Sequence, residues 1–568
     1  MQRQQWWREA EVWLLVLLTG AIYFTRLGDP PLTGEEPRRG QVAREMAEFD
    51  DWIVPRQQGA PFMSRPPVHN WMIALAGAAR GSVDAVAIRL PSAVAMMFLV
   101  LLIYGYSRTF LSRVGALGAG AAFATMGLVL QFGWRGETEA LYTLFVAGSL
   151  LLWRWADVRT LPPLWPWCAG YGLAALGMLA KGPQAPAYFV GGVGLYLVWT
   201  RRWREMLRWP HLAGCALFLL AWAAWFVPFL LRVGIAGAWQ MLSFDIALRF
   251  HGANPLGFFQ HLVVYPFDVA VCMLPWSILL LPYLRRDFRR RVAFARPEIR
   301  FLASGIGVAL LSCWITPGAK NRYFLPLLPC VAPLVGLVVE QCCAAVAVTP
   351  WSNLWKRYLQ GMALIMPAAA VWVLTATVLG LAAEFGTQPP LFAALFVVAA
   401  AVLGGLTFWS SGSRQPLHLR VGILGVATFL GLAWSGAVLN VLVATRQPMG
   451  TDIAAVKQRL PEGTRMVSLG PVDDRFLYYY GEPIRQLPAA AVAQEPPTDW
   501  SYFCMGPVTT PQPACDFAYE TVGVVSNNAM RTEHPTEFIL IGRRLSPPPR
   551  VGSGPELVAQ KPAGTRVR

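Results

Sequence analysis

Residues Leu212–Leu231 read LAGCALFLLAWAAWFVPFLL and contain no charged side chain. A helix of about twenty residues rises roughly 30 Å, which is the thickness of the hydrocarbon core of a bilayer. Apolar stretches of similar character recur at Val12–Tyr23, Ala93–Tyr106, Val114–Leu130, Trp165–Leu179, Ala185–Trp199, Phe258–Leu281, Tyr323–Val339, Met362–Leu381, Leu391–Phe408 and Val421–Leu442. The sequence therefore predicts an α-helical polytopic membrane protein with about thirteen transmembrane helices.

The composition is also typical of a membrane protein, since 55% of the 568 residues are hydrophobic and only 14% are charged. A formal net charge of +16 would suit a nucleic-acid partner. However, the basic residues gather in short segments between spans, such as Arg201-Arg202, Arg285-Arg286, Lys356-Arg357 and Arg414 with Arg420. Such clusters are typical of the cytoplasmic loops of membrane proteins, so we expect membrane lipids and not nucleic acid as partners.

This charge distribution also predicts the orientation of the chain. With the basic segments inside, alternation of the spans places residues 28–82, the turn at Lys181, residues 232–260, the turn at Lys320 and the C-terminal segment outside. Every unusual polar cluster then falls on the extracytoplasmic side. Packing apolar helices in a membrane does not require ionisable residues at its boundary, so such residues indicate a functional site. We therefore expect one aqueous site on the extracytoplasmic side.

The spans cease near Thr445, so the sequence predicts a membrane domain at 1–444. Residues 445–545 are expected to form a small extracytoplasmic α/β domain, and residues 546–568 a disordered tail rich in Pro, Gly and Arg. Strands are predicted at Arg465–Leu469, Phe476–Tyr480, Thr521–Val525 and Phe538–Ile541. An oxidising compartment would allow a disulfide between Cys504 and Cys515, the two cysteines of this domain, and the sequence leaves that pairing open.

The first outer loop, residues 28–82, contains the most unusual polar sequence. Thr33-Gly34-Glu35-Glu36 before Pro37 resembles a capping box that opens a short helix along the membrane surface, with Val42, Met46 and Phe49 on its apolar face. Glu36 then has a structural explanation as a helix cap. Glu35 has no such structural role, so its side chain can face a site.

At these residues the chain resembles a known family. The acidic pair, Arg38, Ala43-Arg44-Glu45-Met46, Asp51-Trp52-Ile53-Val54-Pro55, Arg65-Pro66-Pro67 and Trp71 follow the order found in lipid A aminoarabinose transferases and related dolichyl-phosphate-mannose protein mannosyltransferases. The resemblance covers about the first 345 residues. Its later matches are Lys181-Gly182-Pro183, Arg249-Phe250, Leu274-Pro275-Trp276 and Lys320-Asn321-Arg322-Tyr323.

These families are membrane glycosyltransferases of the C-type fold. The resemblance implies that a glycosyl group, hexosyl or pentosyl, is transferred from a polyprenyl-phosphate donor to a lipid A-like or protein acceptor. The expected donor lipid is undecaprenyl phosphate. The expected place is the periplasmic face of a bacterial inner membrane, and the sugar, the acceptor and the oligomeric state stay open.

The resemblance also implies a set of site residues. Glu35, beside Glu36, matches the catalytic acidic position, where it would orient or deprotonate the acceptor. The leaving phosphate needs cations or donors, which Arg38, Arg65, Lys181, Arg249, Lys320, Arg322 and Tyr323 could supply. Glu139 and His251 are candidate supporting residues. Lys181 could instead anchor at the headgroups, and Tyr323 could belong to an interfacial aromatic belt.

No cofactor is assigned, and a divalent metal stays open. Ser64 stands where the aminoarabinose branch carries an acidic residue, so one carboxylate that could hold a metal is missing. Glu35, His69 and His251 are weak candidate ligands, because a lone histidine at a membrane boundary is more often structural.

A transporter or flippase of a lipid-linked sugar is the alternative, since it would also require many spans and cations at the outer face. Transporters usually place charges near the bilayer midplane and show repeated halves, neither of which is evident in this sequence. A membrane scaffold that displays the C-terminal domain would leave Glu35 and the cationic turns unexplained.

Overall fold

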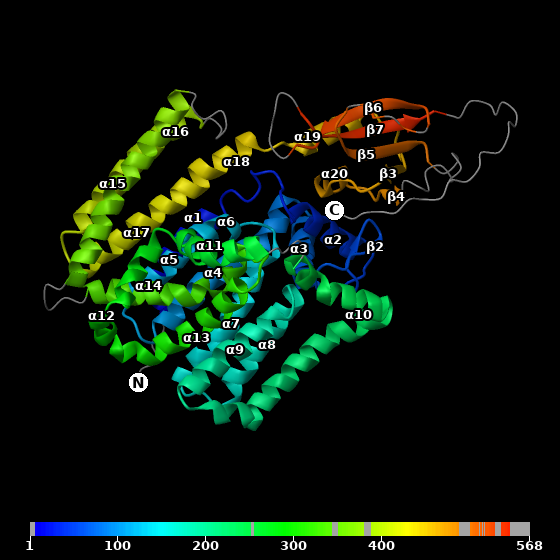
Figure 1. Cartoon of the computed structure of the whole chain (residues 1–568). Helices are drawn as coiled ribbons and strands as arrows, with labels where there is room; N and C mark the ends of the chain where they lie inside the picture. The colour runs from blue at the N-terminus through cyan, green and yellow to red at the C-terminus, as the bar shows by residue number, and fades with distance from the viewer. Residues whose placement is uncertain are drawn as a thin grey trace, which may run out of the picture. The chain divides into compact units, whose positions relative to one another are not determined.

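The structure is a computed structural model that describes residues 6–250, 255–343, 350–379, 388–487, 500–510, 512–513, 515, 517–528 and 535–545. The predicted tail at 546–568 and the side chains of Arg249 and His251 lie outside the described residues. The chain forms two compact units, residues 1–446 and 447–568. Figure 1 shows the helices of the first unit and the strands of the second.

The first unit is built from helices. They are α1 (Ala10–Tyr23), α2 (Glu36–Glu48), α3 (Val68–Arg80), α4 (Ala85–Ser107), α5 (Arg113–Thr125), α6 (Gly127–Phe132), α7 (Thr138–Val158), α8 (Leu164–Ala180), α9 (Gln184–Trp199), α10 (Trp209–Phe250), α11 (Pro255–Cys272), α12 (Arg286–Arg291), α13 (Arg296–Trp314), α14 (Leu328–Cys343), α15 (Pro350–Val378), α16 (Pro390–Ser410), α17 (Pro416–Leu432) and α18 (Leu439–Thr445). Short 3-10 helices lie at Trp6–Arg8, Trp203–Leu207, Trp276–Leu284, Ala293–Ala295 and η5 (Asn321–Leu327), and Ala433–Val438 is a π-helix.

Seven helical segments among the described residues are long and apolar enough to cross a membrane. They are Ala85–Ser107, Trp209–Ser243, Pro255–Cys272, Asn321–Cys342, Asn353–Val378, Pro390–Ser410 and Pro416–Thr445. The apolar helices α1 and α8 are shorter, and α7 and α13 have the length but carry charged residues. The count of about thirteen spans therefore stays a prediction.

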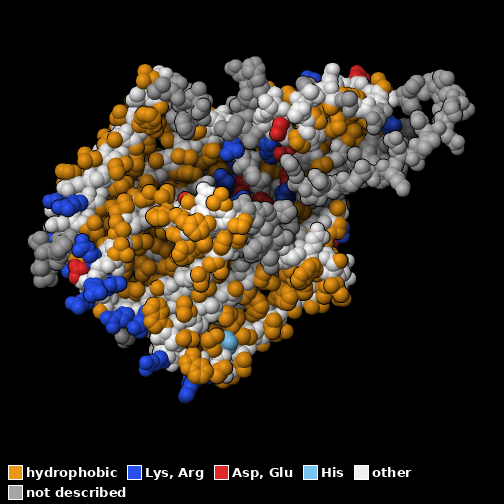
Figure 2. Space-filling view, in the orientation of Figure 1, with side chains coloured by type: hydrophobic (Ala, Val, Ile, Leu, Met, Phe, Trp, Pro, Cys, Tyr) orange, Lys and Arg blue, Asp and Glu red, His pale blue; other side chains and the backbone are white. Residues whose placement is uncertain are grey.

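The surface of the first unit fits a bilayer environment. Figure 2 shows hydrophobic side chains over most of the visible helices, with Lys and Arg side chains gathered at the end of the bundle where α12 lies. Large apolar side chains such as Leu231, Ile235 and Val378 are strongly exposed, which costs free energy in water but not in lipid.

The first outer loop folds in part as its sequence predicts. α2 begins at Glu36 with Pro37 in its first turn, and the Glu36 carboxylate accepts from the backbone N–H of Thr33 at 3.0 Å, which is one half of a capping box. Val42 and Met46 are buried, whereas Phe49 ends the helix and is half exposed. The hairpin of β1 (Arg56–Gln57) and β2 (Ala60–Pro61) and helix α3 pack against α2.

The predicted outer loop at 232–260 is wrong in detail. Helix α10 continues to Phe250 and is interrupted only at Gly234, whose positive φ of 73° breaks the helical path. Glycine accepts this conformation without a steric penalty, so one long apolar segment changes direction there.

The second unit contains a five-stranded mixed sheet with the order β4-β3-β5-β7-β6. Its strands are β3 (Met466–Leu469), β4 (Arg485–Leu487), β5 (Tyr502–Val508), β6 (Tyr519–Ser526) and β7 (Phe538–Arg544). β3 runs parallel to β4 and β5, whereas β7 runs antiparallel to β5 and β6. Helix α19 (Met449–Lys457) shares an apolar core with this sheet, so the predicted small α/β domain is confirmed.

One predicted strand is wrong. Phe476–Tyr480 belongs to helix α20 (Asp474–Tyr480), because the Asp473 carboxylate caps the backbone N–H of Arg475 and Gly481 ends the helix with a φ of 83°. Capping signals at both ends thus outweigh the β-propensity of the aromatic residues between them. Cys504 is buried in β5 and Cys515 is partly buried, and the two are not joined by a disulfide in this structure.

Candidate active site

The two carboxylates of the Thr33–Glu36 segment have different surroundings. Glu36 is fully buried, whereas the side chain of Glu35 is 37% exposed. Both follow Gly34, which has a φ of +62° and lies so close to Glu137 that a Cβ there would be 2.7 Å from Oε1. The turn therefore needs glycine for its conformation and for its close approach to Glu137.

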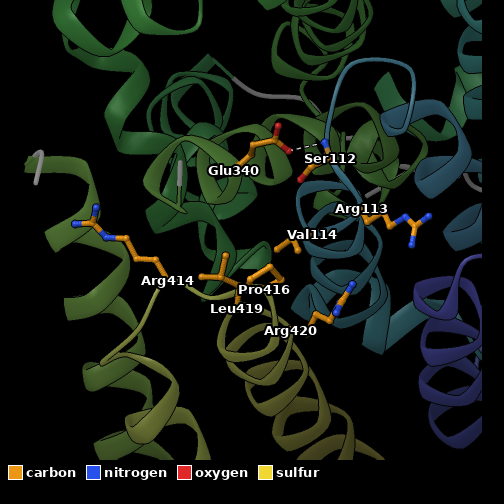
Figure 3. A pocket seen from close by; sticks show the side chains of 8 residues that line it. All are labelled: Ser112, Arg113, Val114, Glu340, Arg414, Pro416, Leu419 and Arg420. Atoms are coloured by element: carbon orange, nitrogen blue, oxygen red, sulfur yellow. Dashed lines mark hydrogen bonds between the residues drawn. The ribbon is translucent and has the colours of Figure 1, made fainter. Parts of the chain in front are cut away.

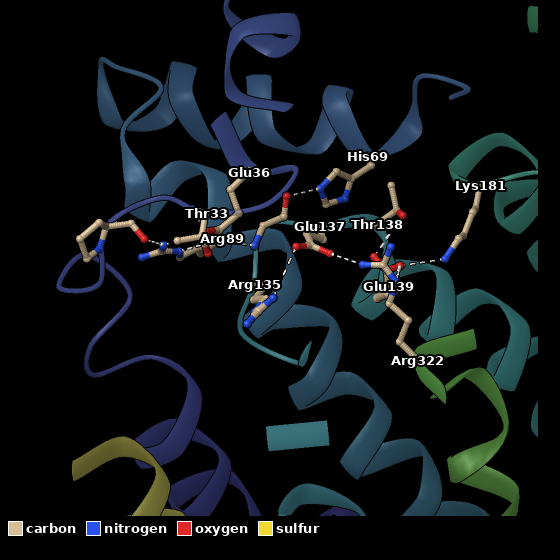
Figure 4. Close-up of polar contacts among 12 residues, drawn as sticks. Thr33, Glu36, His69, Arg89, Arg135, Glu137, Thr138, Glu139, Lys181 and Arg322 are labelled. Carbon is tan, nitrogen blue, oxygen red and sulfur yellow. Dashed lines mark hydrogen bonds and ion pairs between the residues drawn. The ribbon is translucent and has the colours of Figure 1, made fainter. Parts of the chain in front are cut away.

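Glu36 is held by four donors. Its Oε1 accepts from Nε of Arg89 at 2.6 Å and from the backbone N–H of Gly136 at 2.9 Å. Its Oε2 accepts from Nη2 of Arg89 at 2.9 Å and from the N–H of Thr33 at 3.0 Å. Burial acts to raise the pKa of Glu36, but these bonds, shown in part in Figure 4, have the larger effect and hold this pKa below its usual range. Because both oxygens are occupied, the geometry favours a structural role for Glu36 over the predicted catalytic one.

Glu35 is the accessible carboxylate. Its Oε2 accepts from Nη2 of the buried Arg39 at 2.6 Å, and its Oε1 lies 3.6 Å from Nη1 of Arg38. Burial acts to raise the pKa of Glu35, but three guanidinium groups, led by that of Arg39 and including that of Arg65, hold this pKa below its usual range. Glu35 is therefore an anion at neutral pH, and the raised pKa that a general base would need is absent.

A second acidic pair faces the same region from the start of α7. The Oε2 of Glu137 lies 3.2 Å from Nη1 of Arg322, and its Oε1 lies 3.7 Å from Nη1 of Arg135. The Oε1 of Glu139 lies 2.9 Å from Nζ of Lys181 and 3.7 Å from Nε of Arg322. Figure 4 shows these ion pairs as a continuous chain from Arg135 to Lys181.

The two members of this pair compete for one set of cations. Glu137 is buried in the segment before α7, and burial together with the negative charge of Glu139 raises its pKa to about 7. Arg135 and Arg322 oppose this rise without cancelling it. Glu137 can therefore change its protonation state near neutral pH, where a change in charge would alter the positive field of the site.

The local sequence explains how Lys181 and Arg322 reach the site. Helix α8 ends at Ala180, because Gly182, with a φ of 141°, and Pro183 follow Lys181. Lys181 is buried at this break and lies over the ring of Tyr323, with Nζ 5.2 Å from its centroid. Tyr323 belongs with Arg322 to η5, so this short helix supplies one cation and supports another.

Arg65 connects the two acidic pairs. It interacts electrostatically with Glu35 and with Glu139, so its side chain lies near both the Thr33–Glu36 segment and the start of α7. The prolines that follow it restrict the backbone of their predecessors, as the sequence predicts.

We call the eleven charged side chains described above the charged cluster. They are Glu35, Glu36, Arg38, Arg39, Arg65, Arg89, Arg135, Glu137, Glu139, Lys181 and Arg322. Seven cations face four carboxylates, so the cluster has an excess of three positive charges when all are ionised. A phosphate monoester, which carries up to two negative charges, would complement that excess.

Three other predicted residues are not counted in the charged cluster. Lys320 precedes η5 and is exposed, and its role in phosphate binding stays a prediction. Arg249 and His251 cannot be placed relative to the charged cluster, because their side chains lie outside the described residues.

His69 has the properties of a structural residue. It is buried, its Nε2 lies 3.1 Å from the carbonyl oxygen of Gly136, and burial together with Arg39 lowers its pKa to about 4. His69 is therefore neutral at pH 7. Among the residues that the structure describes, no group of three His, Cys, Asp or Glu side chains could hold a metal ion.

Sequence reasoning missed Arg89, Arg135 and Glu137 as site residues. Arg89 carried a usable signal, because it is an ionisable residue inside the apolar helix α4, and such residues are rarely tolerated in a span without a partner. Glu137 carried no comparable signal, since it lies in a polar segment and only the fold brings it beside Arg322.

Known proteins resemble this chain in sequence. The profile of the dolichyl-phosphate-mannose-protein mannosyltransferase family matches residues 64–227. The undecaprenyl phosphate-alpha-4-amino-4-deoxy-L-arabinose arabinosyl transferase of Pseudomonas paraeruginosa is 28% identical over 464 residues, which are 79% of this chain and 78% of the relative. A protein of the same name from Aeromonas salmonicida is 29% identical over 336 residues, which are 57% of this chain and 59% of the relative.

A solved structure has the same fold. The crystal structure of ArnT from Cupriavidus metallidurans bound to undecaprenyl phosphate aligns with a TM-score of 0.69 at 17% identity, over 94% of this chain and 98% of that chain. The apo state of the same protein aligns with a TM-score of 0.67 at 18% identity. The predicted C-type membrane fold and the resemblance to aminoarabinose transferases and protein mannosyltransferases are therefore confirmed, as is the prediction of a multi-pass membrane protein.

Proposed function

We propose that this chain, as a relative of the C-type membrane glycosyltransferases, transfers a glycosyl group from undecaprenyl phosphate to a lipid A-like acceptor. The single observation that carries the proposal is the positive excess of the charged cluster, which lies in the part of the chain that resembles these enzymes. The names of the Pseudomonas and Aeromonas relatives support the donor lipid and make 4-amino-4-deoxy-L-arabinose the sugar to test first.

The transfer exchanges one bond at the sugar for another. The bond between C1 of the sugar and the donor phosphate oxygen breaks, and that oxygen keeps the electron pair. A bond forms between C1 and an oxygen of the acceptor, and any proton on that oxygen is released to water. The product phosphate gains negative charge, so fixed cations beside it stabilise the transition state more than the ground state.

We assign the leaving phosphate to Arg65, Lys181 and Arg322. Lys181 and Arg322 are paired with Glu139 and Glu137, and a phosphate that enters would compete with these carboxylates for the same N–H donors. Arginine binds a phosphate through two parallel hydrogen bonds, whereas lysine acts as a point charge. Arg38 and the exposed Lys320 are proposed to attract the donor as it approaches.

We assign Glu35 to the acceptor side of the reaction. Its low pKa makes it a weak base, so it is better suited to accept a hydrogen bond from the acceptor than to remove a proton in advance. Arg39 fixes one oxygen of Glu35 at 2.6 Å, and this contact limits the directions in which the carboxylate can point. Orientation of this kind lowers the entropic cost of bringing acceptor and donor together.

The site is proposed to face the periplasm, with the chain in the inner membrane. The basic segments between spans gather at the end of the bundle where α12 lies, as the positive-inside rule expects of a cytoplasmic side. The charged cluster lies at the start of α4, whereas Arg108 at the end of that helix belongs to a different group of charges. The two groups are therefore at opposite ends of one span.

The direct test is transfer by the purified full-length protein. Undecaprenyl-phosphate-linked 4-amino-4-deoxy-L-arabinose and lipid A are supplied in detergent, and both lipids are followed by mass spectrometry. Transferase activity would add the sugar mass to lipid A and release an equal amount of undecaprenyl phosphate. Intact donor and unmodified lipid A, with enzyme that still binds undecaprenyl phosphate, would overturn the proposal and favour transport of the donor.

A further inference from the structure

A second group of charged residues lies far from the charged cluster. Helix α4 begins at Ala85, one turn before Arg89, and ends at Ser107, so Arg89 and Ser107 are about 27 Å apart along the helix. Arg108 follows and donates to Glu9 at 2.9 Å, and Arg113 lies 3.3 Å from the same carboxylate. The other end of the bundle therefore has its own set of basic side chains.

A cavity of about 480 Å³ opens beside this group. Figure 3 shows its lining, which comes from the start of α5, the end of α14 and the segment from Arg414 into α17. Its lining includes three arginines, Arg113, Arg414 and Arg420, and one acidic residue, Glu340, and Figure 3 shows the side chains of Arg113 and Arg414 pointing to opposite sides. A volume of this size can hold a small ligand group, and its charge favours an anion.

The acidic residues near the cavity are already engaged. Glu340 accepts from the backbone N–H of Ser112 at 2.7 Å and packs so closely on Gly115 that a Cβ there would lie 2.3 Å from Oε2. Arg420 is paired with the buried Glu11, which fixes it at the edge of the cavity. Arg113 shares Glu9 with Arg108, and its side chain is 55% exposed.

The backbone adds positive potential at the same place. α17 begins at Pro416, so its N-terminus lies at the cavity, whereas the N-terminus of α5 is already capped by the Ser112 hydroxyl and the Glu340 carboxylate. Helix N-termini carry a partial positive charge and favour phosphate groups. Val114 and Leu419 supply apolar surface beside these charges.

We infer that this cavity binds the phosphate headgroup of an anionic phospholipid. Arg113 and Arg414 hold the phosphate, Arg420 lines the cavity from its fixed position on Glu11, and Leu419 contacts the start of the acyl chains. The cavity lies at a membrane boundary, because Arg414 stands in the short connection between α16 and α17, both of which are apolar enough to span. Basic pockets at such boundaries are suited to lipid headgroups.

The test is lipid retention by the full-length protein in native mass spectrometry. The protein is released from nanodiscs that contain equal amounts of phosphatidylglycerol and phosphatidylcholine. We expect one phosphatidylglycerol to be retained selectively, and we expect the double variant Arg113→Ala with Arg414→Ala to lose this retention at least fivefold. Since Arg113 is more than half exposed, the single variant Arg113→Ala keeps the test available if the double variant does not fold.

The matched control is Arg204→Ala with Arg208→Ala, which removes two exposed arginines from another segment between spans. It lowers the net charge by the same amount and should keep the selective retention. Equal loss in both double variants, equal retention of the two lipids, or complete displacement by millimolar inorganic phosphate would each overturn the inference. Equal loss in both double variants would indicate general electrostatic attraction of anionic lipid. Equal retention of the two lipids would indicate binding without headgroup selectivity, and displacement by phosphate would indicate a site for free phosphate.

Discussion

Arg89 and Glu36 form a bidentate ion pair in which neither side chain is exposed, with Nε to Oε1 at 2.6 Å and Nη2 to Oε2 at 2.9 Å. Arg89 also donates to the carbonyl oxygens of Leu27 and Pro30, both at 2.8 Å. The pair thus ties the first outer loop to helix α4. This anchor holds Glu35, the preceding residue, beside Arg39.

Arg89→Ala should destabilise the protein strongly, because it leaves the buried Glu36 carboxylate without its charged partner. Loss of one partner of a buried ion pair costs about 3–5 kcal/mol. Thermal unfolding of the full-length protein in detergent measures this loss. The control is Arg80→Ala, which removes an exposed partner of Asp84 and should leave the melting temperature close to that of the unmodified protein. Equal stability of both variants would show that Arg89 does not anchor the loop.

Gly34→Ala should disturb the site through Glu137. The added Cβ would lie 2.7 Å from Oε1 of Glu137, and alanine is also strained at a φ of +62°. Gly59→Ala is the matched control, because Gly59 has a similar φ of +74° with nothing within 4 Å of its added Cβ. Both variants should lose some stability, but only Gly34→Ala should weaken undecaprenyl phosphate binding. An equal effect of both variants on binding would contradict the contact with Glu137.

Arg322→Ala should weaken binding of undecaprenyl phosphate about tenfold, or roughly 1.4 kcal/mol, because it removes a forked cation shared by Glu137 and Glu139. Lys320→Ala removes an exposed cation two residues away and should have a smaller effect, since water screens exposed charges. Both variants can be compared by titration with the lipid phosphate in detergent. A larger loss in Lys320→Ala would place the phosphate outside the charged cluster.

Binding of the donor lipid should depend on pH through Glu137. In the folded protein the pKa of Glu137 is about 7, which is above its ordinary value of 4.5. Protonated Glu137 therefore stabilises the folded state. This stabilisation is fully present below pH 4.5 and is lost as the pH rises through about 7. Protonated Glu137 also leaves Arg135 and Arg322 available to an anion. Affinity for undecaprenyl phosphate should therefore fall as pH rises through 7.

The control for this pH dependence is Glu137→Gln, which is neutral at every pH and keeps the shape of the side chain. The fall in affinity around pH 7 should be smaller in this variant. Ionisation of the lipid phosphate acts in the opposite direction in both proteins, because its second negative charge strengthens the attraction to the charged cluster. Identical pH profiles for the two proteins would exclude Glu137 as the titrating group.

The sequence predicts the helical membrane unit well, because apolar length is a local property of the chain. It also predicts helix α2, since Thr33 and Glu36 are close in sequence and the contact between the Thr33 N–H and the Glu36 carboxylate forms within one turn. Phe476–Tyr480 is wrong as a strand, because the caps at Asp473 and Gly481 decide its structure and not its aromatic residues. The interruption at Gly234 depends on a single backbone conformation that hydropathy does not report.

The candidate site is predicted less completely than the fold. Glu35, Arg65, Lys181 and Arg322 are identified through their motifs, and the structure brings them into one region. The different roles of Glu35 and Glu36 depend on Arg89, which lies 53 residues from Glu36 in the chain. The raised pKa of Glu137 depends on its burial beside Glu139, which no sequence pattern reveals.

The most direct test of the proposed transfer is mass spectrometry of envelope lipids and proteins from cells that carry either the unmodified chain or Glu35→Gln. Glutamine keeps an oxygen that can accept from Arg39, so the variant should fold and bind the donor lipid. We expect the transferred sugar to fall on the order of 100-fold while its undecaprenyl-linked donor accumulates. An unchanged sugar level in cells that contain stable variant protein would contradict the assignment of Glu35 and the reaction proposed for this site.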